Sequence, residues 1–506
     1  MVTEMSAFNW VCCARMVACW RRVALGIFLL MPVVWFTSWS AAARADVQAE
    51  VWVTTQDLTK KLHAEAPMRF AKDQQRPDGT ATTDGTIHVL AEKTHQVMLG
   101  FGSSFEHSTC YNLSRLDEKQ RQDAIARLVD RKTGIGMNLM RICIGTPDFT
   151  GEPWYSYDDL PPGQTDPDLK QFSIEKDLRY VIPILKAARE HNPQLLFFAS
   201  PWSPPGWMKS TGTMIGGRLL PEHHAAYAAY FVKFIQAYER EGISIHAVTV
   251  QNEPGVDRQK DAPKWRYPSC RWTGEEECNF IRDHLGPQFK ANRLTTKIWC
   301  YDHNYNVLPT PDGDDPGIAY PRQILSDPRA AEYVAGVAFH GYAGKPEGMS
   351  EFLKEFPSWP VHFTEGSVFG LGGSSRLIGL LSHGASSYNA WVTMIDDTGK
   401  PNNGPFRALR TCIMLKANSL TVDYPLDYYL YGQFMKFIDR GAVRIEVTPP
   451  DAECPAIGFK NPDGTLVVVV VNLRKKERPI AIQVTGLQAS PVLAAQSVTT
   501  LAWQPK

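Results

Sequence analysis

Two glutamates stand where a barrel protein would carry its chemistry. Glu253 follows the apolar run 247–250, and Glu365 ends the run 361–365. They are 112 positions apart, yet the carboxyl ends of barrel strands converge on one mouth. Facing carboxyl groups can cleave a glycosidic bond, because one protonates the leaving oxygen while the other attacks or activates water. The alternative, two unrelated surface glutamates, fits either residue alone better than both.

The elements that would position these glutamates alternate between strand-like and helical patterns. The strand candidates are 97–103, 138–145, 195–200, 247–252, 297–302, 336–342, 361–365 and 385–391. Helix candidates lie at 117–131, 174–190, 222–241, 275–290 and 405–418. Eight such units predict an α/β fold, a closed (β/α)₈ TIM barrel. A doubly wound sheet is disfavoured, because the glycine clusters 100–102 and 370–373 complete no dinucleotide-binding pattern, and we interpret both as turns.

The pattern changes near residue 421 to short strands, which predict an all-β sandwich. These are 442–447, 455–460, 465–473, 479–484 and 497–503. The valine run 467–471 is apolar at every position, as expected for a strand covered on both faces. We expect a leader at 1–45, a β segment at 46–92 that joins the sandwich, a barrel at 93–420 and the sandwich at 421–506.

The first 45 residues have the pattern of a secretory signal peptide. Arg21 and Arg22 precede the apolar run 23–39, and Ala-Arg-Ala at 43–45 resembles a cleavage site. We therefore expect a secreted or periplasmic protein with no stable membrane span after cleavage; an uncleaved anchor is the alternative. Translation that begins at Met16 would give a leader of the usual length.

Composition excludes several function classes. The chain has 53 basic and 53 acidic residues, which argues against a nucleic-acid-binding face. Ten cysteines show no repeated Cys-x-x-Cys pairs, so no zinc ribbon is indicated. Three of them lie in the leader. Among the remaining seven, Cys270 and Cys278 could bridge or stay free.

Aromatic residues gather at the same predicted mouth. Trp202, Tyr342 and Trp391 follow or end strand candidates, and aromatic rings bind the C–H faces of sugars. Hydrogen-bonding partners for sugar hydroxyls are available from Asp148, Arg141, Asn252 and His340. Each of these residues taken alone has a structural explanation; Arg141, for example, could be a buried ion-pair partner.

The ordered set of motifs resembles glycoside hydrolase family 30, the glucosylceramidase family. The set consists of Phe101-Gly102, 138–141, Asp148-Phe149, 200–209, 252–254, His340-x-Tyr342 and Thr364-Glu365. Asn-Glu-Pro at 252–254 is moderately specific by itself, whereas the whole set in this order is strong. The resemblance covers nearly the whole chain after the leader.

The resemblance implies a retaining double displacement. Glu253 would be the general acid/base, with a raised pKa, and Glu365 the nucleophile. By the same resemblance Asn252 would bind the sugar 2-hydroxyl. The other implied substrate-site residues are Asp148, Trp202 and Trp391, which would hold the sugar, and Arg141, His340 and Tyr342, which would orient Glu365. No metal or organic cofactor is implied.

Departures from the family pattern leave the substrate open. Gly341 stands where the family commonly has tryptophan, and Val392 where asparagine is familiar. The leading hypothesis is hydrolysis of β-glucosidic bonds in a carbohydrate or glycolipid. The alternatives are an endo- or exo-glycanase such as a β-1,6-glucanase or β-xylosidase, and a noncatalytic carbohydrate-binding protein.

Overall fold

The computed structural model describes residues 47–72, 84–259, 261, 263–305, 317–408 and 410–505. The predicted leader at 1–45 lies outside these residues, so cleavage and secretion stay predictions. Within the described ranges, no helix is both long and apolar enough to cross a membrane.

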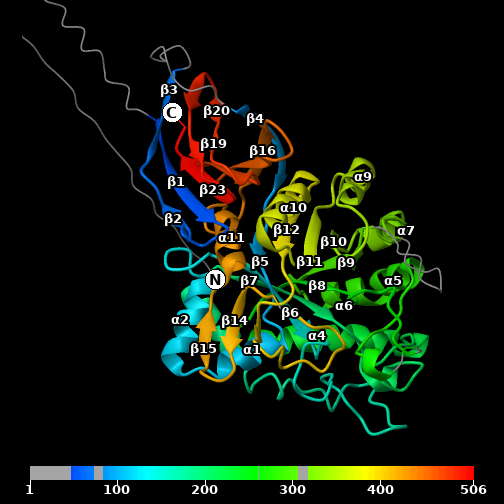
Figure 1. The fold of residues 1–506 in the computed structure, drawn as a ribbon. Helices are drawn as coiled ribbons and strands as arrows, with labels where there is room; N and C mark the ends of the chain where they lie inside the picture. The colour runs from blue at the N-terminus through cyan, green and yellow to red at the C-terminus, as the bar shows by residue number, and fades with distance from the viewer. Residues whose placement is uncertain are drawn as a thin grey trace, which may run out of the picture. The chain divides into compact units, whose positions relative to one another are not determined.

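Eight parallel strands form the barrel predicted from the sequence (Figure 1). In chain order they are β5 (Gly100–Gly102), β6 (Leu139–Ile144), β7 (Leu196–Pro201), β8 (Ile245–Thr249), β9 (Lys297–Asn304), β10 (Val334–His340), β11 (Val361–Glu365) and β12 (Ala385–Asn389). Neighbours in sequence pair from β6 to β12, and β12 pairs with β5. The last gap closes where the Arg141 amide donates to the Ser103 carbonyl at 2.9 Å.

Helices cover the outside of the strands, as the apolar spacing predicts. They are α1 (His107–Ser114), α2 (Glu118–Val129), α3 (Val181–His191), α4 (His224–Arg240), α5 (Gly274–Phe280), the π segment η4 (Ile281–Leu285), α6 (Gly286–Ala291), α7 (Ala319–Leu325), α8 (Pro328–Ala331), α9 (Glu347–Glu355) and α10 (Gly370–Ser382). Short 3-10 turns occupy Gly206–Met208, Pro221–His223 and Pro263–Trp265.

Both glycine clusters interpreted as turns lie in regular elements, so that prediction was wrong. Gly100–Gly102 is the strand β5, and Gly370 begins α10. Glycine is needed in β5 because a Cβ at Gly102 would lie 1.9 Å from the Leu139 carbonyl oxygen. The cluster therefore permits a close approach of two strands at the point where the barrel closes.

The helix predicted at 405–418 was also wrong. The chain there contains the strand β14 (Ile413–Lys416), which pairs with β13 (Met394–Asp396) and β15 (Thr421–Asp423). Within this strand Ile413 and Leu415 are buried while Met414 and Lys416 are partly exposed, which is strand alternation. Pairing with a segment distant in sequence therefore decided the local structure.

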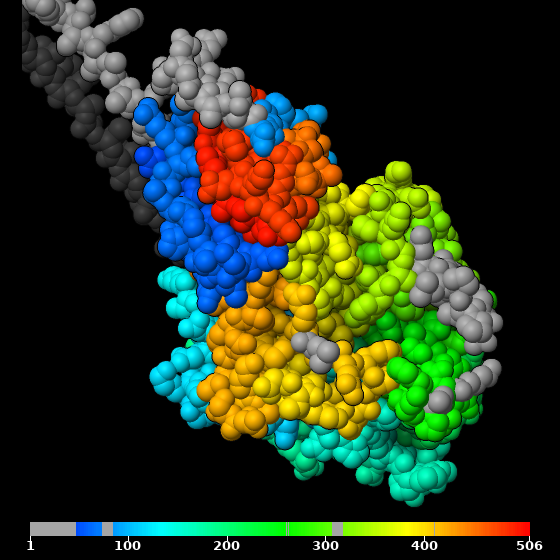
Figure 2. All heavy atoms as spheres, viewed as in Figure 1, coloured from blue at the N-terminus to red at the C-terminus, as the bar shows by residue number. Residues whose placement is uncertain are grey.

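The β-sandwich is built from both ends of the described chain. Its sheet order is β2-β1-β23-β18-β17-β16-β4-β20-β21-β3, and β3 also pairs with β1. The strands are β1 (Val47–Thr55), β2 (His63–Ala64), β3 (Met68–Lys72), β4 (Thr86–Val97), β16 (Val443–Thr448), β17 (Ala456–Lys460), β18 (Leu466–Asn472), β20 (Ala481–Val484), β21 (Leu487–Ala489) and β23 (Ser497–Trp503); β19 (Arg478–Pro479) pairs with β22 (Val492–Leu493) beside them. Figure 2 shows the first and last strands side by side.

The valine run of β18 is covered on both faces, as predicted. Leu466, Val468 and Val470 pack in the sandwich core, whereas the alternate valines belong to the larger core shared with the barrel. The helix α11 (Leu426–Met435) joins the two cores, because Gln433 donates to Thr54 at 2.8 Å and accepts from Thr500 at 2.6 Å.

The barrel interior has an apolar layer with a polar layer above it. The apolar cluster is Leu139, Phe198, Ala247, Trp299 and Ala338, one residue from each of five neighbouring strands. Two positions further along, β6 and β7 present Arg141 and Ser200 to the same interior, and both are fully buried. The apolar layer thus forms a dry floor beneath charged side chains.

We predict that Gly102→Ala destabilises the barrel by about 3 kcal/mol or more, because the clash is with backbone and no side chain can rotate away. Gly379→Ala is the matched control. Gly379 lies inside α10 with open space where a Cβ would be, so alanine should raise the free energy of unfolding by roughly 0.5–1 kcal/mol. Urea unfolding of both variants measures the difference. Equal midpoints would contradict this account of barrel closure.

Candidate active site

The polar layer centres on a buried ion pair between Arg141 and Asp302. Neither side chain has any exposed surface. One nitrogen of Arg141, Nη2, donates to Asp302 Oδ2 and to Asn252 Oδ1, both at 2.8 Å. The other, Nη1, donates to Glu365. One guanidinium therefore links residues from four strands or the loops that follow them.

Asp302 accepts hydrogen bonds from five side chains around the barrel. Its two oxygens receive donors at 2.6–3.1 Å from Arg141, Ser200, Thr249, His340 and Thr364. Burial alone would raise the pKa of Asp302, but the charges of Arg141 and His340 and these hydrogen bonds lower it below its usual range. Asp302 is thus a fixed negative charge at the centre of the site.

A bulge in β9 turns Asp302 toward the interior. Trp299 faces the barrel interior, so regular alternation would turn Tyr301 inward and Asp302 outward. Instead Cys300 and Tyr301 both pack in the outer core, and the register with β10 skips Asp302. Tyr301 and Asp302 have positive φ angles of 77° and 75°, and a bulge re-aims the side chain that follows.

Glu365 ends β11 and is held at both carboxylate oxygens. Arg141 donates to Oε2, and the Tyr342 hydroxyl donates to Oε1 at 2.7 Å. The loop that carries Tyr342 is fixed in turn by Asn304, whose Oδ1 accepts the amides of Tyr342 and Ala343 at 3.0 and 3.1 Å. Glu365 is only 4% exposed, yet it lines the cavity.

Glu253 lies in the loop after β8, four residues beyond Thr249, with a positive φ of 50°. Its amide donates to the Asp302 carbonyl at 3.1 Å, and its Oε1 lies 3.4 Å from His340 Nδ1 and 3.9 Å from His303 Nδ1. Burial favours a raised pKa, but the hydrogen bond to His340 and the charges of His303, His340 and Arg258 outweigh it and lower the pKa of Glu253. The raised pKa that the family resemblance implied for this glutamate was therefore wrong.

His340 lies between the acidic residues and is completely buried. Its Nε2 is 3.1 Å from Asp302 Oδ1 and 3.9 Å from Glu365 Oε2, while Nδ1 faces Glu253. Burial lowers the pKa of His340, but the negative charges of Glu365 and Asp302 and the hydrogen bonds to Asp302 and Glu253 raise it to about 9. His340 is therefore mainly protonated at neutral pH, with its Nδ1 facing Glu253.

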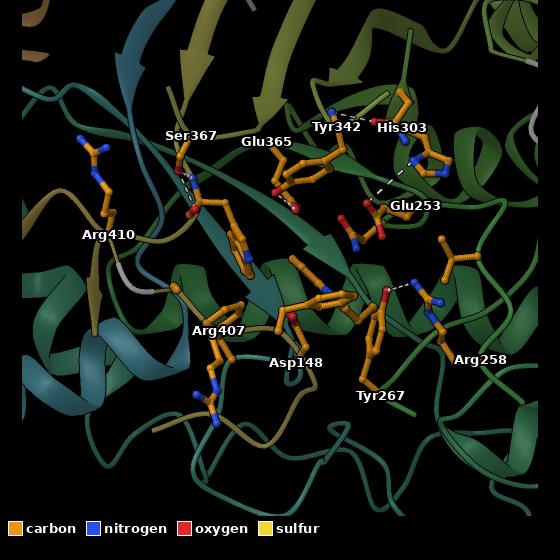
Figure 3. A pocket seen from close by; sticks show the side chains of 18 of the residues that line it. Asp148, Glu253, Arg258, Tyr267, His303, Tyr342, Glu365, Ser367, Arg407 and Arg410 are labelled. Atoms are coloured by element: carbon orange, nitrogen blue, oxygen red, sulfur yellow. Dashed lines mark hydrogen bonds and ion pairs between the residues drawn. The ribbon is translucent and has the colours of Figure 1, made fainter. Parts of the chain in front are cut away.

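A cavity of about 780 Å³ opens above the two glutamates, which both point into it (Figure 3). Trp202 and Trp391 stack at 5.0 Å between ring centroids on one wall. Asp148 lies on the same side, 4% exposed. Burial, together with the charges of Glu365 and Glu253, raises the pKa of Asp148 well above its usual value.

An aromatic strip continues from this cavity to its rim. Tyr267 and Phe406 line the cavity with ring centroids 5.7 Å apart, and Trp265 lies 6.4 Å beyond Phe406. Trp265 and Phe406 are 45% and 43% exposed. Arg258 packs over the Tyr267 ring and donates to its hydroxyl at 3.1 Å. The strip starts at Tyr267, in the loop after β8 that also carries Glu253.

The site could hold a divalent transition metal at one cluster. Glu253, His303 and His340 each offer one ligand atom, and these atoms lie within 4.8 Å of one another.

The seven cysteines after the leader are buried free thiols. Cys270 and Cys278 are among them, so these two are not joined by a disulfide bond.

The structure brings all nine sequence-predicted site residues to this cavity or to the layer beneath it. Sequence reasoning missed Asp302, His303 and Asn304, three consecutive residues of β9, as well as Arg258 and the aromatic strip. The fifth strand candidate, 297–302, ends at Asp302 just as 361–365 ends at Glu365, and β9 extends two residues further, to His303 and Asn304. No sequence signal marked the bulge at Asp302.

Comparison with known proteins identifies the class. The model of the glycosyl hydrolase family 30 TIM-barrel domain matches residues 98–379, and that of the family 30 beta sandwich domain matches residues 441–501. The fold and these matches define a glycoside hydrolase. The chain belongs to glycosyl hydrolase family 30, as the motif resemblance indicated.

Relatives with two different activities resemble the chain to a similar degree. It is 30% identical to an endo-1,6-β-D-glucanase of Neurospora crassa over 90% of this chain and 95% of that one. It is 28% identical to the lysosomal acid glucosylceramidase of Mus musculus over 83% of each chain. The solved structure of the endo-β1,6-glucanase BT3312 superposes with a TM-score of 0.79 and 28% identity, over 91% of this chain and 99% of that one.

We predict that His340 makes stability fall with rising pH. Its folded pKa of about 9 exceeds the ordinary 6.5, so its contribution is complete below pH 6.5 and is lost as pH rises to 9. The loss is on the order of 3 kcal/mol. His340→Gln should lower stability overall but flatten its slope across this interval. Urea unfolding at several pH values measures both slopes, and identical slopes would contradict the assignment.

Proposed function

We propose that the chain is a retaining β-glycosidase that hydrolyses β-glucosidic bonds, with Glu253 as general acid/base and Glu365 as nucleophile. The observation that carries the proposal is the asymmetric environment of two carboxylates that share one cavity. Arg141 and Tyr342 hold both oxygens of Glu365, whereas Glu253 faces the protonatable ring of His340. The export predicted from residues 1–45 is part of this proposal.

The first step transfers the sugar to the enzyme. A Glu365 oxygen attacks the anomeric carbon, the bond from that carbon to the leaving oxygen breaks, and Glu253 gives its proton to the leaving oxygen. A glycosyl ester of Glu365 and a free alcohol result. In the second step water attacks the anomeric carbon, Glu253 takes the water proton, and Glu365 leaves as the carboxylate. Neither step needs a metal or an organic cofactor.

His340 would supply the proton that Glu253 delivers. The low pKa of Glu253 and the raised pKa of His340 place this proton on His340, whose Nδ1 lies 3.4 Å from Glu253 Oε1. Transfer across this contact leaves a neutral imidazole whose Nε2–H still faces Asp302. Asp302 thus keeps the ring in one orientation in both protonation states.

The remaining residues would bind the sugar. Asn252 Oδ1 is occupied by Arg141, so its amide NH₂ is left to donate to a hydroxyl beside Glu365. The stacked pair Trp202 and Trp391 offers an apolar ring surface, and Asp148 offers a carboxyl group from the same side of the cavity. This combination of rings and hydrogen-bonding groups suits a pyranose.

We predict that Glu253→Gln and Glu365→Gln each lower kcat for a β-glucoside by at least about 10³-fold, because each removes an acid or a nucleophile that water replaces poorly. Glu222→Gln, on an exposed residue outside the cavity, is the matched control and should keep the wild-type rate. Steady-state kinetics with methyl β-glucoside and a β-glucan, whose leaving oxygens both need a proton, measure all three. Unchanged hydrolysis in either site variant would refute the proposal.

A second candidate, a β-1,6-glucanase, is favoured by the aromatic strip. The leaving group lies on the side of Glu253, and the strip of Tyr267, Phe406 and Trp265 begins in the Glu253 loop. Among the described residues that line the cavity, the aliphatic ones are Val256 and Ala408. Rings suit further sugar units, whereas the chains of a ceramide would pack best on aliphatic side chains.

We predict that Trp265→Ala and Phe406→Ala each lower kcat/KM for β-1,6-glucan oligosaccharides by about 3- to 10-fold, the value of one aromatic contact. Both should leave kcat/KM for β-glucosyl fluoride within about 2-fold, since its leaving group is a single atom. Equal losses on the two substrates would exclude a role on the leaving-group side. A greater loss on glucosylceramide than on the glucan would favour the lipid substrate instead.

A further inference from the structure

A buried carboxyl group outside the barrel supports the bulge that presents Asp302. Glu277 on α5 has no exposed surface, and its Oε1 accepts the backbone amide of Tyr301 at 2.9 Å. Tyr301 is the first of the two bulged residues in β9. The contact thus joins α5, a helix of the outer layer, to the bulge in β9 that presents Asp302 to the polar layer.

The carboxyl group of Glu277 is itself fixed in place. Its Oε2 accepts from the Tyr320 hydroxyl at 2.8 Å, and the Tyr320 ring lies 5.1 Å from the Tyr301 ring. The helix α5, which carries Glu277, begins with a capping box between Thr273 and Glu276. These hydrogen bonds fix the first turn of the helix, and Glu277 follows directly after Glu276. The backbone of α5 therefore sets the position of the oxygen that accepts the Tyr301 amide, and Tyr320 on α7 pairs with the second oxygen.

The bulge needs such support because its backbone is strained. Tyr301 and Asp302 are not glycine, yet their φ angles are 77° and 75°, a conformation that is unfavourable for residues with a side chain. Conformations of this kind persist only where surrounding contacts fix them. Burial raises the pKa of Glu277 to about 8, so at neutral pH the group is mainly the uncharged acid and burying it costs little.

Both glutamates of the site depend on this bulge. The Asp302 side chain holds Arg141 and His340, which contact Glu365 and Glu253 respectively. The Asp302 carbonyl also accepts the amide of Glu253 at 3.1 Å. Relaxation of the bulge by one residue would return the Asp302 side chain to the outer face of the strand.

We propose that Glu277 is a positioning residue for the hydrolytic reaction: by holding the Tyr301 amide, it fixes the inward orientation of Asp302 and thereby the geometry of Glu253 and Glu365. The proposal rests on the proposed function. It assigns to Glu277 no contact with substrate; Glu277 acts through Asp302.

Glu277→Met tests the proposal, because methionine fills the same volume and cannot accept the Tyr301 amide. We expect kcat for β-glucosyl fluoride to fall at least 10-fold while KM changes less than 3-fold. Glu277→Gln keeps an acceptor of the same size and should stay within 3-fold of wild type. Tyr320→Phe removes the other hydrogen bond of Glu277; it should lower the unfolding midpoint yet leave kcat within 3-fold.

The pH profile separates positioning from general destabilisation. Displacement of Asp302 removes a charge that raises the pKa of His340, so the basic limb of kcat/KM should move to lower pH in Glu277→Met and stay in place in Tyr320→Phe. The groups that face His340 are Glu253, Asp302, His303, Tyr342 and Glu365, and none of the variants alters them directly.

The outcomes are distinct. A folded Glu277→Met with wild-type kcat and pH profile overturns the proposal, as does a Glu277→Gln that loses activity while folded. If Glu277→Met does not fold, the Glu277→Gln result decides. Failure of the proposed function is recognised separately, because wild-type hydrolysis would then not depend on Glu365.

Discussion

The buried pair of Arg141 and Asp302 is the interaction on which the site depends. Removing two charges from water is costly, and their mutual attraction offsets the cost only where further hydrogen bonds satisfy the remaining donors and acceptors. Here the further partners come from β7, β8, β10 and β11 and from the residues just after β8, so satisfying the pair fixes those strands relative to one another. Loss of either partner would leave an uncompensated charge in the barrel interior.

The apolar layer beneath the pair makes this arrangement effective. Trp299 stacks on His362 at 4.0 Å, and burial lowers the pKa of His362 to about 3, so this ring is neutral. The charges above it therefore face a floor without competing charge. Electrostatic interactions are stronger where water is excluded, so the orientation of Glu253 and Glu365 follows from groups below the cavity as well as from those that line it.

Much of this could be predicted from the sequence. Each barrel strand is a short apolar run with a polar end, and that pattern identified the fold and, at two strand ends, Glu253 and Glu365. Asp302 ends the fifth strand candidate, but alternation from Trp299 would place its side chain outside the barrel. The bulge that reverses it depends on contacts with residues distant in sequence, among them Glu277, 24 residues earlier. The helix predicted at 405–418 was wrong for a similar reason, because the strand Ile413–Lys416 pairs with a strand that begins at Met394. The pKa direction of Glu253 also depends on His303 and His340, which the fold alone brings near.

The most direct measurement of the central claim, that this layer holds Glu365 as the nucleophile and Glu253 beside His340 as the acid, is covalent trapping. A mechanism-based cyclitol inhibitor reacts with the nucleophile of a retaining glycosidase, and mass spectrometry of the digested enzyme locates the adduct. The account predicts one adduct per chain, on the peptide that contains Glu365. An adduct on Glu253, or no adduct while the enzyme is still turning over substrate, would contradict it.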